Sequence, residues 1–479
     1  MNFNSIIFLC FFLVFFFLYW FLFNKKNETQ NLLILIGSYF FYGWWDWRFL
    51  FLLIGFSALN FYLGIKISKS NSDRWRKIYL NIGLFQGIGG LLFFKYFNFF
   101  ITSFKDSFAA FGVNLDIHTL NIIVPLGISF FTFRTISYLL DVENERIEAS
   151  TNALIFFNYV SFFPSILSGP IDKARDFIPQ LEKKRDFEYE TAVDGLKQIL
   201  WGLFKKLVIA DNCAFIVNQV FTRFEVMPSS SLWLGMLLYF IQVYADFSGY
   251  SDMAIGVSKL LGFHVSKNFD FPIFAQSIPE YWRKWHISLT SWLTEYVFTP
   301  LSYQFRRYGK FGLILAIVIN FVIVGIWHGA EWTYVLYGFV HGLFFIPAIL
   351  NGTFNKNKKT DLNKNFPSFM ELVNIIATLI PVMFTFILFK SETVSQAFIY
   401  YGRMFDCSFF SEPIPMPCYV TVFIIFFFLM EWKGRNQDYA IKTTGIKFPI
   451  VFRLLFYYFL IAAIFIFSAR EQQFIYFHF

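Results

Sequence analysis

The chain has 479 residues, of which 57% are hydrophobic, 23% aromatic and only 15% charged, and its formal net charge is +8. A soluble globular domain carries about 25% charged residues and fewer apolar ones, so this composition excludes that class. We therefore expect an integral membrane protein whose constant partner is the lipid bilayer, and we expect no nucleic acid partner.

Apolar runs of about 20 residues can cross a bilayer as helices, and shorter ones can do so where the bilayer is thinned. The first run has no basic residue before it and no small-residue cleavage site after it, so we expect a retained span and not a cleaved signal peptide. The sequence predicts an all-α integral membrane protein with about 11–12 transmembrane helices. The candidate spans lie near residues 5–23, 32–46, 49–65, 78–98, 121–140, 197–220, 232–248, 312–327, 333–350, 369–389, 418–431 and 450–468.

Basic residues cluster in three of the loops between these spans, and such loops belong on the cytoplasmic side. Counting spans from each loop predicts that both termini lie outside, and the three loops agree on that count. The clusters are Lys66, Lys69, Arg74, Arg76 and Lys77 in the first loop, Lys356, Lys358, Lys359 and Lys364 in the second, and Lys433, Arg435, Lys442 and Lys447 in the third.

Two regions depart from the pattern of simple spans. Residues 152–170 are apolar but contain Pro164 and end in Ser168-Gly169-Pro170, which predicts a re-entrant or interfacial element. The stretch from about 247 to 310 is aromatic, basic and hydrophobic together, which is typical of a surface in the inner headgroup layer.

A helix is expected to begin at Ser277 in this second region, because Ser277-Ile-Pro-Glu280 has the form of a capping box. The residues that share one face of it are Trp282, Trp285, Leu289, Trp292 and Tyr296, whereas Arg283, His286, Thr290 and Leu293 share an adjoining face. The tryptophan stripe is interpreted as an interfacial aromatic belt. His286 has two open interpretations, a buried packing histidine and a functional one.

The triplet Trp327-His328-Gly329 lies inside one of the most apolar parts of the chain. Ionisable residues at membrane depth are expensive and usually mark a pathway or an active site. Histidine also exchanges its proton nearest to neutral pH. We therefore predict that His328 is the chemical centre of a membrane enzyme.

The geometry expected around His328 supports this prediction. Residues 312–327 form only about 24 Å of helix at 1.5 Å per residue, which is short of the roughly 30 Å hydrocarbon thickness. His328 is therefore expected to be recessed from the outer surface. Asn320 and Glu331 must be satisfied within protein or water. The glycines that we expect to permit close packing of the helices are Gly325, Gly329 and Gly338.

The cysteines indicate no site of their own. Cys10, Cys213, Cys407 and Cys418 are widely spaced and form no C-x-x-C pair or Cys/His cluster. Neither a structural zinc site nor a disulfide framework is indicated, and we expect no metal.

Several sequence strings, taken in order, resemble the membrane-bound O-acyltransferase (MBOAT) family, and in particular its bacterial alginate O-acetylation branch. The resemblance covers nearly the whole chain. The strings are Gly37-Ser-Tyr-Phe-Phe-Tyr-Gly-Trp-Trp45, Pro125-Leu-Gly-Ile-Ser-Phe-Phe-Thr-Phe133, Ser168-Gly169-Pro170-Ile, Trp201-Gly-Leu-Phe-Lys-Lys206, Asp246-Phe-Ser-Gly-Tyr-Ser-Asp252, Trp282-Arg-Lys-Trp-His286-Ile-Ser-Leu, and Trp327-His328-Gly329-Ala-x-Trp332-Thr-x-Val-Leu-x-Gly338-x-x-His341-Gly342.

The resemblance implies one polytopic domain over residues 1–479, with N-terminal helices in 1–120, a catalytic core in about 121–350, C-terminal helices in 351–479 and a central tunnel. It implies that His328 is the active-site histidine and that His286 is the second polar position. A histidine base suits this chemistry because a hydroxyl is a poor nucleophile until its proton is removed. His341 matches the terminal His-Gly of the motif, and a structural role is favoured for it.

The resemblance also implies the other participants. Acetyl-CoA is expected as a cytoplasmic donor substrate, with no permanently bound cofactor. The final acceptor is expected to be a cell-surface or secreted polysaccharide, with a separate extracytoplasmic acetyltransferase as a candidate intermediate carrier. The location implied is the bacterial inner membrane.

One departure and two alternatives stay open. The family's Asp-Tyr-x-x-x-Pro-Leu-Gly-Gly string is replaced here by Glu295-Tyr-Val-Phe-Thr-Pro300-Leu-Ser302-Tyr303, which leaves the acceptor and partner contacts in doubt. The first alternative is the related branch that moves D-alanine to teichoic acids. The second is a polysaccharide transporter or channel without acyl chemistry, although the sequence has no clear inverted repeat. Transfer of label from acetyl-CoA distinguishes an acetyltransferase from a transporter.

Overall fold

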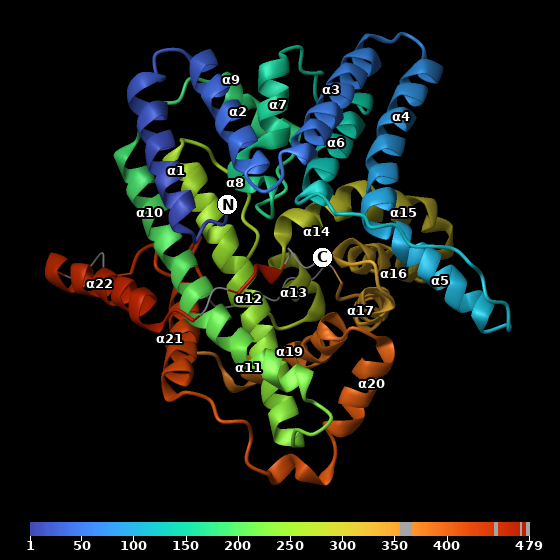
Figure 1. Cartoon of the computed structure of the whole chain (residues 1–479), viewed down its shortest axis with the longest axis vertical. Helices are drawn as coiled ribbons and strands as arrows, with labels where there is room; N and C mark the ends of the chain where they lie inside the picture. The colour runs from blue at the N-terminus through green and yellow to red at the C-terminus, as the bar shows by residue number, and fades with distance from the viewer. Residues whose placement is uncertain (355–365, 445–448, 470–471, 476–479) are drawn as a thin grey trace. The chain divides into compact units, whose positions relative to one another are not determined.

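The computed structural model describes residues 1–354, 366–444, 449–469 and 472–475 (Figure 1). Every regular element within these ranges is helical, and they contain no strand. The chain divides into two compact units, Met1–Gly195 with Val257–Ser266, and Leu196–Gly256 with Lys267–Phe479. The predicted single domain over residues 1–479 stays a prediction beside this division.

The first unit is built on helical hairpins. α3, α4 and α6 pack against one another, and α7 packs against α2, α3 and α9. Its helices are α1 (Ile6–Phe17), the π-helical turn η1 (Leu18–Leu22), α2 (Asn27–Gly43), α3 (Arg48–Lys69), α4 (Asp73–Leu91), the π-helical turn η2 (Leu92–Tyr96), α5 (Phe97–Ala109), α6 (Ile128–Glu143), α7 (Ala153–Ser161), α8 (Phe163–Ile166), α9 (Ala174–Glu182) and the start of α10 (Tyr189–Phe204).

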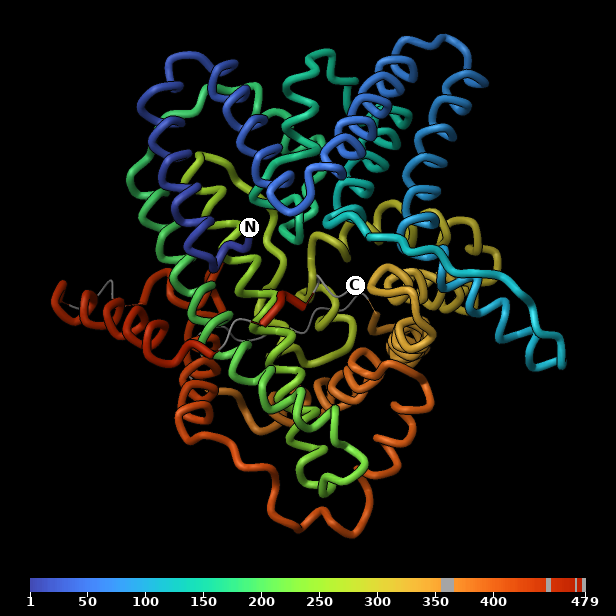
Figure 2. The backbone as a smooth tube through the Cα atoms, in the orientation of Figure 1, coloured from blue at the N-terminus to red at the C-terminus, as the bar shows by residue number. Residues whose placement is uncertain are grey.

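The second unit holds the three histidines of the predicted site. Its helices are the rest of α10, η3 (Lys205–Ala210), α11 (Asp211–Thr222), most of α12 (Ser229–Leu260), η4 (Pro272–Phe274), α13 (Ile278–Lys284), α14 (Ile287–Leu293), η5 (Thr294–Phe298), α15 (Thr299–Gln304), η6 (Arg306–Tyr308), α16 (Gly309–His328), α17 (Trp332–Leu343), α18 (Ile346–Leu350), α19 (Phe369–Lys390), α20 (Val394–Arg403), η7 (Cys407–Phe410), α21 (Cys418–Gly434) and α22 (Ile450–Phe467). Figure 2 shows α16 and α17 side by side as a hairpin.

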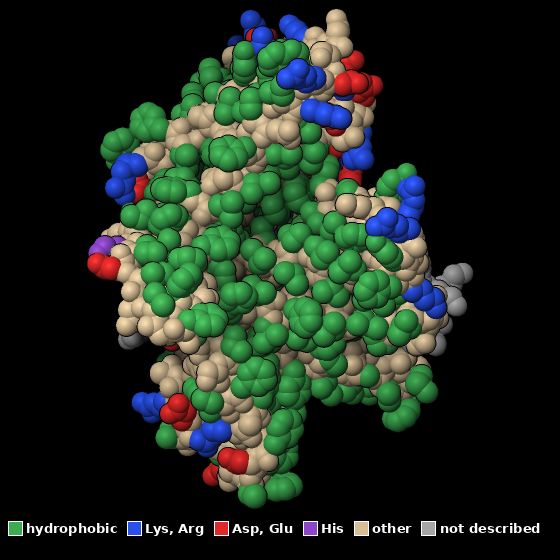
Figure 3. Space-filling view, turned by 90° about the vertical axis from the view of Figure 1, so that its right-hand side faces the viewer, with side chains coloured by type: hydrophobic (Ala, Val, Ile, Leu, Met, Phe, Trp, Pro, Cys, Tyr) green, Lys and Arg blue, Asp and Glu red, His purple; other side chains and the backbone are tan. Residues whose placement is uncertain are grey.

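Six described helices are long and apolar enough to cross a membrane, and Ile6–Leu22 forms a shorter apolar helix. Large apolar side chains are exposed along them, as on α1 and α22, and hydrophobic side chains predominate on the face in Figure 3. Soluble proteins rarely expose so large an apolar surface to water, whereas the hydrocarbon core of a bilayer can cover it. The predicted all-α integral membrane class is therefore confirmed. Other predicted spans fall on shorter helices such as α2, α6 and α21. The count of about a dozen and the tunnel stay predictions.

Residues 152–170 form no full span. The helices α7 and α8 are separated by a break at Phe162, and the side chains of Tyr159 and Phe162 are fully buried. The buried Arg134 of α6 donates to the Tyr159 carbonyl at 2.9 Å and to Ser165 Oγ at 2.5 Å. A guanidinium, with its several donors, can hold this irregular backbone together inside the unit.

The first basic loop lies between α3 and α4. Arg76 at its end donates to Glu145 Oε1 at 2.8 Å and to the carbonyl of Glu143 at 2.6 Å. The segment after α6 therefore lies at the same end of the first unit as this loop. This agrees with the predicted spans, which put both segments on the cytoplasmic side. Lys356, Lys358, Lys359 and Lys364 of the second loop, and Lys447 of the third, lie outside the described residues. Both termini outside stays a prediction.

Candidate active site

His328 is the last residue of α16, and its side chain is 2% exposed. Its ring centroid lies 4.9 Å from that of Trp327, 5.0 Å from that of Phe389 on α19 and 6.1 Å from that of Tyr337 on α17. Glu331 and Trp332, only three and four residues later, are exposed. The imidazole is therefore buried behind the turn that follows it, in a chamber of aromatic rings, and its recess from the outer membrane surface stays a prediction.

Two glycines bring α16 and α17 into backbone contact. A Cβ atom on Gly325 would lie 2.1 Å from the Tyr334 carbonyl oxygen, and one on Gly338 would lie 2.2 Å from the Phe321 carbonyl oxygen. Real atoms do not approach so closely, so only glycine permits this hairpin. The predicted packing role of these residues is confirmed, and its consequence is that His328 is held against α17.

His286 occupies a break between α13 and α14. Its backbone is left-handed, with φ 44° and ψ 54°, and its side chain is 1% exposed. The expected single helix from Ser277 is therefore wrong at this point, although Ser277 does cap α13 by accepting from the Glu280 amide. The Glu280 carboxylate accepts a hydrogen bond from the amide of Gln276 at 2.9 Å, which lies one residue before the cap.

The backbone of Asn268 and Asp270 forms hydrogen bonds on both sides of this break. The Asp270 amide donates to the Lys284 carbonyl at 3.0 Å, and the Ile287 amide donates to the Asn268 carbonyl at 2.8 Å. The Lys284 carbonyl and the Ile287 amide, which lie on either side of His286, are therefore not bonded within a continuous helix. The buried Asn268 side chain also accepts from Ser288 Oγ at 2.6 Å and donates to Ser251 Oγ at 3.1 Å.

The break brings His286 to the same indole as His328. The His286 ring centroid lies 5.6 Å from that of Trp327 and 4.6 Å from that of Phe247 on α12. Because these rings replace water around the imidazole, burial lowers the pKa of His286 to about 3. His286 is therefore neutral near pH 7, which suits a positioning or hydrogen-bonding group better than a proton acceptor.

His341 is joined to two other helices through both of its nitrogens. Trp282 Nε1 of α13 lies 3.2 Å from Nδ1, and Thr385 Oγ1 of α19 lies 2.9 Å from Nε2. An indole N–H can only donate, so Nδ1 accepts and Nε2 carries the proton. Thr385 Oγ1 then accepts a hydrogen bond from the Nε2–H group, and its own hydroxyl donates to the Val382 carbonyl at 2.6 Å. With both nitrogens engaged, His341 has the geometry of a structural residue, as favoured from the sequence.

The tryptophan stripe is not an interfacial belt. Trp282, Trp285 and Trp292 are 3%, 2% and 5% exposed, so all three are buried inside the protein. Trp285 stacks on Tyr281 at 5.4 Å, and Trp282 meets Phe321 edge-on at 4.8 Å. The belt interpretation fails because the backbone break at His286 turns these rings toward α16, α17 and α19.

A buried charged cluster supports the α12 wall of the site, and no role was assigned to its residues from the sequence. Lys205 Nζ lies 2.6 Å from Asp252, and Lys206 Nζ lies 2.8 Å from Asp246 and 2.9 Å from Asp211. Asp246 immediately precedes Phe247, so these ion pairs fix the turn of α12 that faces His286. The available signal was that Lys205, Lys206, Asp246 and Asp252 stand within two of the motif strings.

Glu431 of α21 extends this support. It accepts from Trp201 Nε1 at 3.1 Å and from the Tyr244 hydroxyl at 2.5 Å, and the Tyr244 ring lies 6.2 Å from that of Trp285. Within the described ranges, no group of three or more His, Cys, Asp or Glu side chains is arranged to hold a metal ion.

Comparison with known proteins places this chain in a family. Residues 126–389, more than half of the chain, match the MBOAT, membrane-bound O-acyltransferase family, and this region includes His286, His328 and His341. The chain is 34% identical over 411 residues to the probable alginate O-acetylase AlgI of Pseudomonas syringae pv. tomato, covering 85% of this chain and 75% of that protein.

Two other relatives carry different names. The peptidoglycan O-acetyltransferase of Helicobacter pylori is 34% identical over 345 residues, which is 67% of this chain and 64% of that protein. The teichoic acid D-alanyltransferase of Bacillus subtilis is 28% identical over 234 residues, which is 47% of this chain and 58% of that protein. The chain therefore belongs to the membrane-bound O-acyltransferase family and is a multi-pass membrane O-acyltransferase.

Proposed function

We propose that this protein transfers an acetyl group from acetyl-CoA on the cytoplasmic side toward a polysaccharide outside the bacterial inner membrane, with His328 as the general base. The names of two relatives, probable alginate O-acetylase and peptidoglycan O-acetyltransferase, support an acetyl group and a polysaccharide acceptor. The observation that carries the assignment is the burial of His328 among Trp327, Tyr337 and Phe389 at the end of an apolar helix.

In the proposed reaction His328 accepts the proton of the attacking hydroxyl while the hydroxyl oxygen bonds to the thioester carbonyl carbon. The carbon–sulfur bond of the tetrahedral intermediate then breaks, and the imidazolium returns the proton to the leaving sulfur. The products are an ester and a free thiol, with no net proton gained or lost. The aromatic walls favour transfer over hydrolysis because they exclude water.

His286 is proposed as the second site residue, acting in its neutral form. It contacts Trp327 from another helix, so it can orient the donor or hold the indole that flanks His328. The acetyl group then reaches the polysaccharide directly or through a separate extracytoplasmic acetyltransferase.

The test is transfer of label from acetyl-CoA by the purified protein. His328→Ala should lower the rate by about 10²–10⁴-fold, the usual contribution of a positioned base, with membrane abundance near normal. His118→Ala is the matched control. His118 is exposed and has no role in the proposed reaction, so this variant should keep the wild-type rate. His286→Asn should reduce the rate less than His328→Ala. Normal transfer by His328→Ala contradicts the base assignment.

The Bacillus subtilis relative supports a second candidate, in which the donor carries D-alanine. The same protein should be offered a D-alanyl thioester of a carrier protein beside acetyl-CoA. Transfer of D-alanine without transfer of acetyl contradicts the acetyl donor and leaves the role of His328 unchanged.

A further inference from the structure

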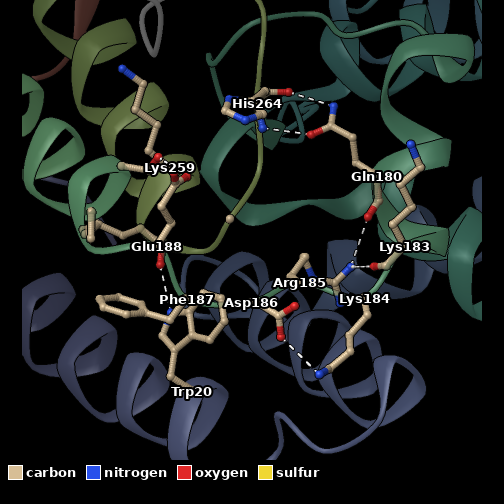
Figure 4. Close-up of a pocket in the computed structure, with 14 residues that line it drawn as sticks. Trp20, Gln180, Lys183, Lys184, Arg185, Asp186, Phe187, Glu188, Lys259 and His264 are labelled. Carbon is tan, nitrogen blue, oxygen red and sulfur yellow. Dashed lines mark hydrogen bonds and ion pairs between the residues drawn. The ribbon is translucent and has the colours of Figure 1, made fainter.

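The first unit contains a cavity of about 340 Å³. None of the three site histidines lines it, and it has no role in the proposed reaction. Three segments line it: Trp20 of η1, residues 180–192 from the end of α9 to the start of α10, and residues 259–264 from the last two residues of α12 onward (Figure 4). The volume falls within the range of small-ligand sites, roughly 300–1,000 Å³.

The walls of this cavity are held in place by their own hydrogen bonds. Gln180 Nε2 donates to the His264 carbonyl at 2.9 Å, and the His264 amide donates to Gln180 Oε1 at 2.8 Å, as Figure 4 shows. Trp20 Nε1 donates to the Leu260 carbonyl at 2.9 Å. Segments far apart in sequence are thus locked together, and a shaped site exists before any ligand arrives.

Arg185 forms part of the floor and is committed to the fold. It is buried, and it donates through Nε to Tyr19 Oη at 2.7 Å and through one terminal nitrogen to Asn31 Oδ1 at 2.7 Å. Its other terminal nitrogen donates to the Gln180 carbonyl at 3.2 Å. Its charge remains in the cavity while its donors are used by the protein.

The cavity is lined by four positive side chains, Lys183, Lys184, Arg185 and Lys259, and by two carboxylates, Asp186 and Glu188. Lys183 and Lys184 are both exposed at its edge. Lys184 lies 3.1 Å from Asp186 in a pair whose side chains are 59% and 82% exposed. Such an exposed pair contributes about 0–1 kcal/mol, so an anionic ligand can readily replace the aspartate. Figure 4 shows the Lys183 and Lys184 side chains extending to different sides, so each lysine supplies a separate ammonium group at the edge of the cavity.

A second, smaller cavity with four aromatic side chains in its wall adjoins the first. It has a volume of about 160 Å³, shares Trp20, Arg185, Asp186 and Phe187 with the first, and adds Phe16, Phe21 and Asn24. Phe21 is 67% and Phe187 50% exposed. Phe21 continues the exposed apolar surface of Ile6–Leu22, the shorter apolar helix. The two cavities together have an end with cationic side chains and an end with exposed aromatic side chains.

We propose that this double cavity binds an anionic phospholipid, with the phosphate-bearing headgroup at Lys183 and Lys184 and an acyl chain along Phe16 and Phe21. Figure 1 shows the turn between α1 and α2, which follows Trp20 in the chain, and the basic loop between α3 and α4 at the same end of the first unit. The positive-inside prediction puts that end at the cytoplasmic leaflet, where anionic lipids are concentrated. A soluble phosphate compound would make no use of the second, smaller cavity.

The test is native mass spectrometry of the purified full-length protein with phosphatidylglycerol and with phosphatidylcholine of the same acyl chains. Phosphatidylglycerol should be retained more strongly by the wild type. The double variant Lys183→Gln, Lys184→Gln should weaken its retention roughly 30-fold, since each lysine beside an anionic lipid contributes about fivefold. The matched control, Lys69→Gln with Lys77→Gln, removes two exposed lysines from the basic loop and should change retention by less than about twofold.

Competition with soluble compounds separates a lipid from a free phosphate ligand. Glycerophosphoglycerol, which is the headgroup without acyl chains, and coenzyme A should not displace the lipid at equal concentration. Three results overturn the proposal: equal retention of the two lipids by the wild type, including no retention of either; equal losses in the two double variants; and displacement by either soluble compound, which would assign the cavity to a soluble phosphate ligand.

Discussion

At the scale of single residues, the most informative feature is the left-handed backbone of His286. A non-glycine residue there costs about 1–2 kcal/mol, although Asn, Asp and His adopt it more often than other residues. Such strain persists where the surroundings over-determine it, and functional sites are where it collects. Asn268 supplies those surroundings through its carbonyl to Ile287 and its side chain to Ser288.

The buried, neutral His286 should make the protein sensitive to acid. Its pKa lies near 3 in the folded chain and near 6.5 when unfolded. A lowered pKa stabilises the fold above the unfolded value, and that stability is lost as the pH falls below about 6.5. Between pH 7 and pH 5 this amounts to about 2 kcal/mol. His286→Asn keeps a residue that tolerates the backbone and should remove this part of the loss of thermal stability.

The matched control for this measurement is His118→Asn, in which an exposed histidine is replaced. Its melting temperature should change with pH as that of the wild type does. If His286→Asn also follows the wild type from pH 7 to pH 5, the ring is hydrated and the positioning role argued for it fails.

At the scale of elements, the α16–α17 hairpin determines where His328 lies. The two backbones touch at Gly325 and Gly338, one turn before His328 and within the first two turns of α17. The aromatic chamber is completed by Phe389 of α19 and Tyr337 of α17. His341 joins α17 to α13 and α19, so the helices around the site are bonded side chain to side chain.

A methyl group at Gly325 should therefore displace His328. Gly325→Ala places an atom 2.1 Å from the Tyr334 carbonyl, so the helices must separate, which typically costs about 1–3 kcal/mol. Acyl transfer should fall in the same variant because His328 is one turn away. Thermal stability and transfer rate are both measured.

Gly55→Ala is the matched control for this variant. Gly55 also lies inside a long apolar helix, α3, but a Cβ atom there meets nothing within 4 Å. It should leave activity unchanged and raise stability by up to about 1 kcal/mol, because alanine favours helix. Similar behaviour of the two variants would mean that the hairpin tolerates separation and does not hold His328.

At the scale of the whole molecule, the arrangement across the membrane follows from charge and apolar length. Lysine and arginine gather at the ends of predicted spans, and the Arg76–Glu145 pair joins two such ends within the first unit. The rule that positive loops stay in the cytoplasm turns this pattern into a direction for each helix.

Cysteine labelling tests that direction. In a variant without the native cysteines, Ser70→Cys and Arg435→Cys should be shielded from a membrane-impermeant thiol reagent in intact cells, whereas Ser107→Cys and Ser411→Cys should react. All four should react after permeabilisation, which controls for burial. Labelling of Ser70→Cys in intact cells would reverse the predicted sidedness.

The sequence by itself determined the membrane class, the regions of the six long apolar helices and the family strings, and it singled out His328 as an ionisable residue in an apolar stretch. These are local properties, because hydropathy and motif spacing are read along a continuous stretch of chain. It also predicted the close helix packing at Gly325 and Gly338. The N-cap at Ser277 was predicted as well, since a cap depends on residues three apart.

Only the tertiary structure decided how the site is assembled. The helix containing His286 is broken where Asn268 and Asp270, which lie more than a dozen residues before it, form backbone hydrogen bonds on both sides, and that break buries the tryptophans that a periodic helix would have exposed to the interface. His341 meets Trp282 across a separation of 59 residues. Hydrogen bonds between residues so far apart leave no periodic signal in the sequence, so neither the break nor the tautomer of His341 was predictable before the helices were packed.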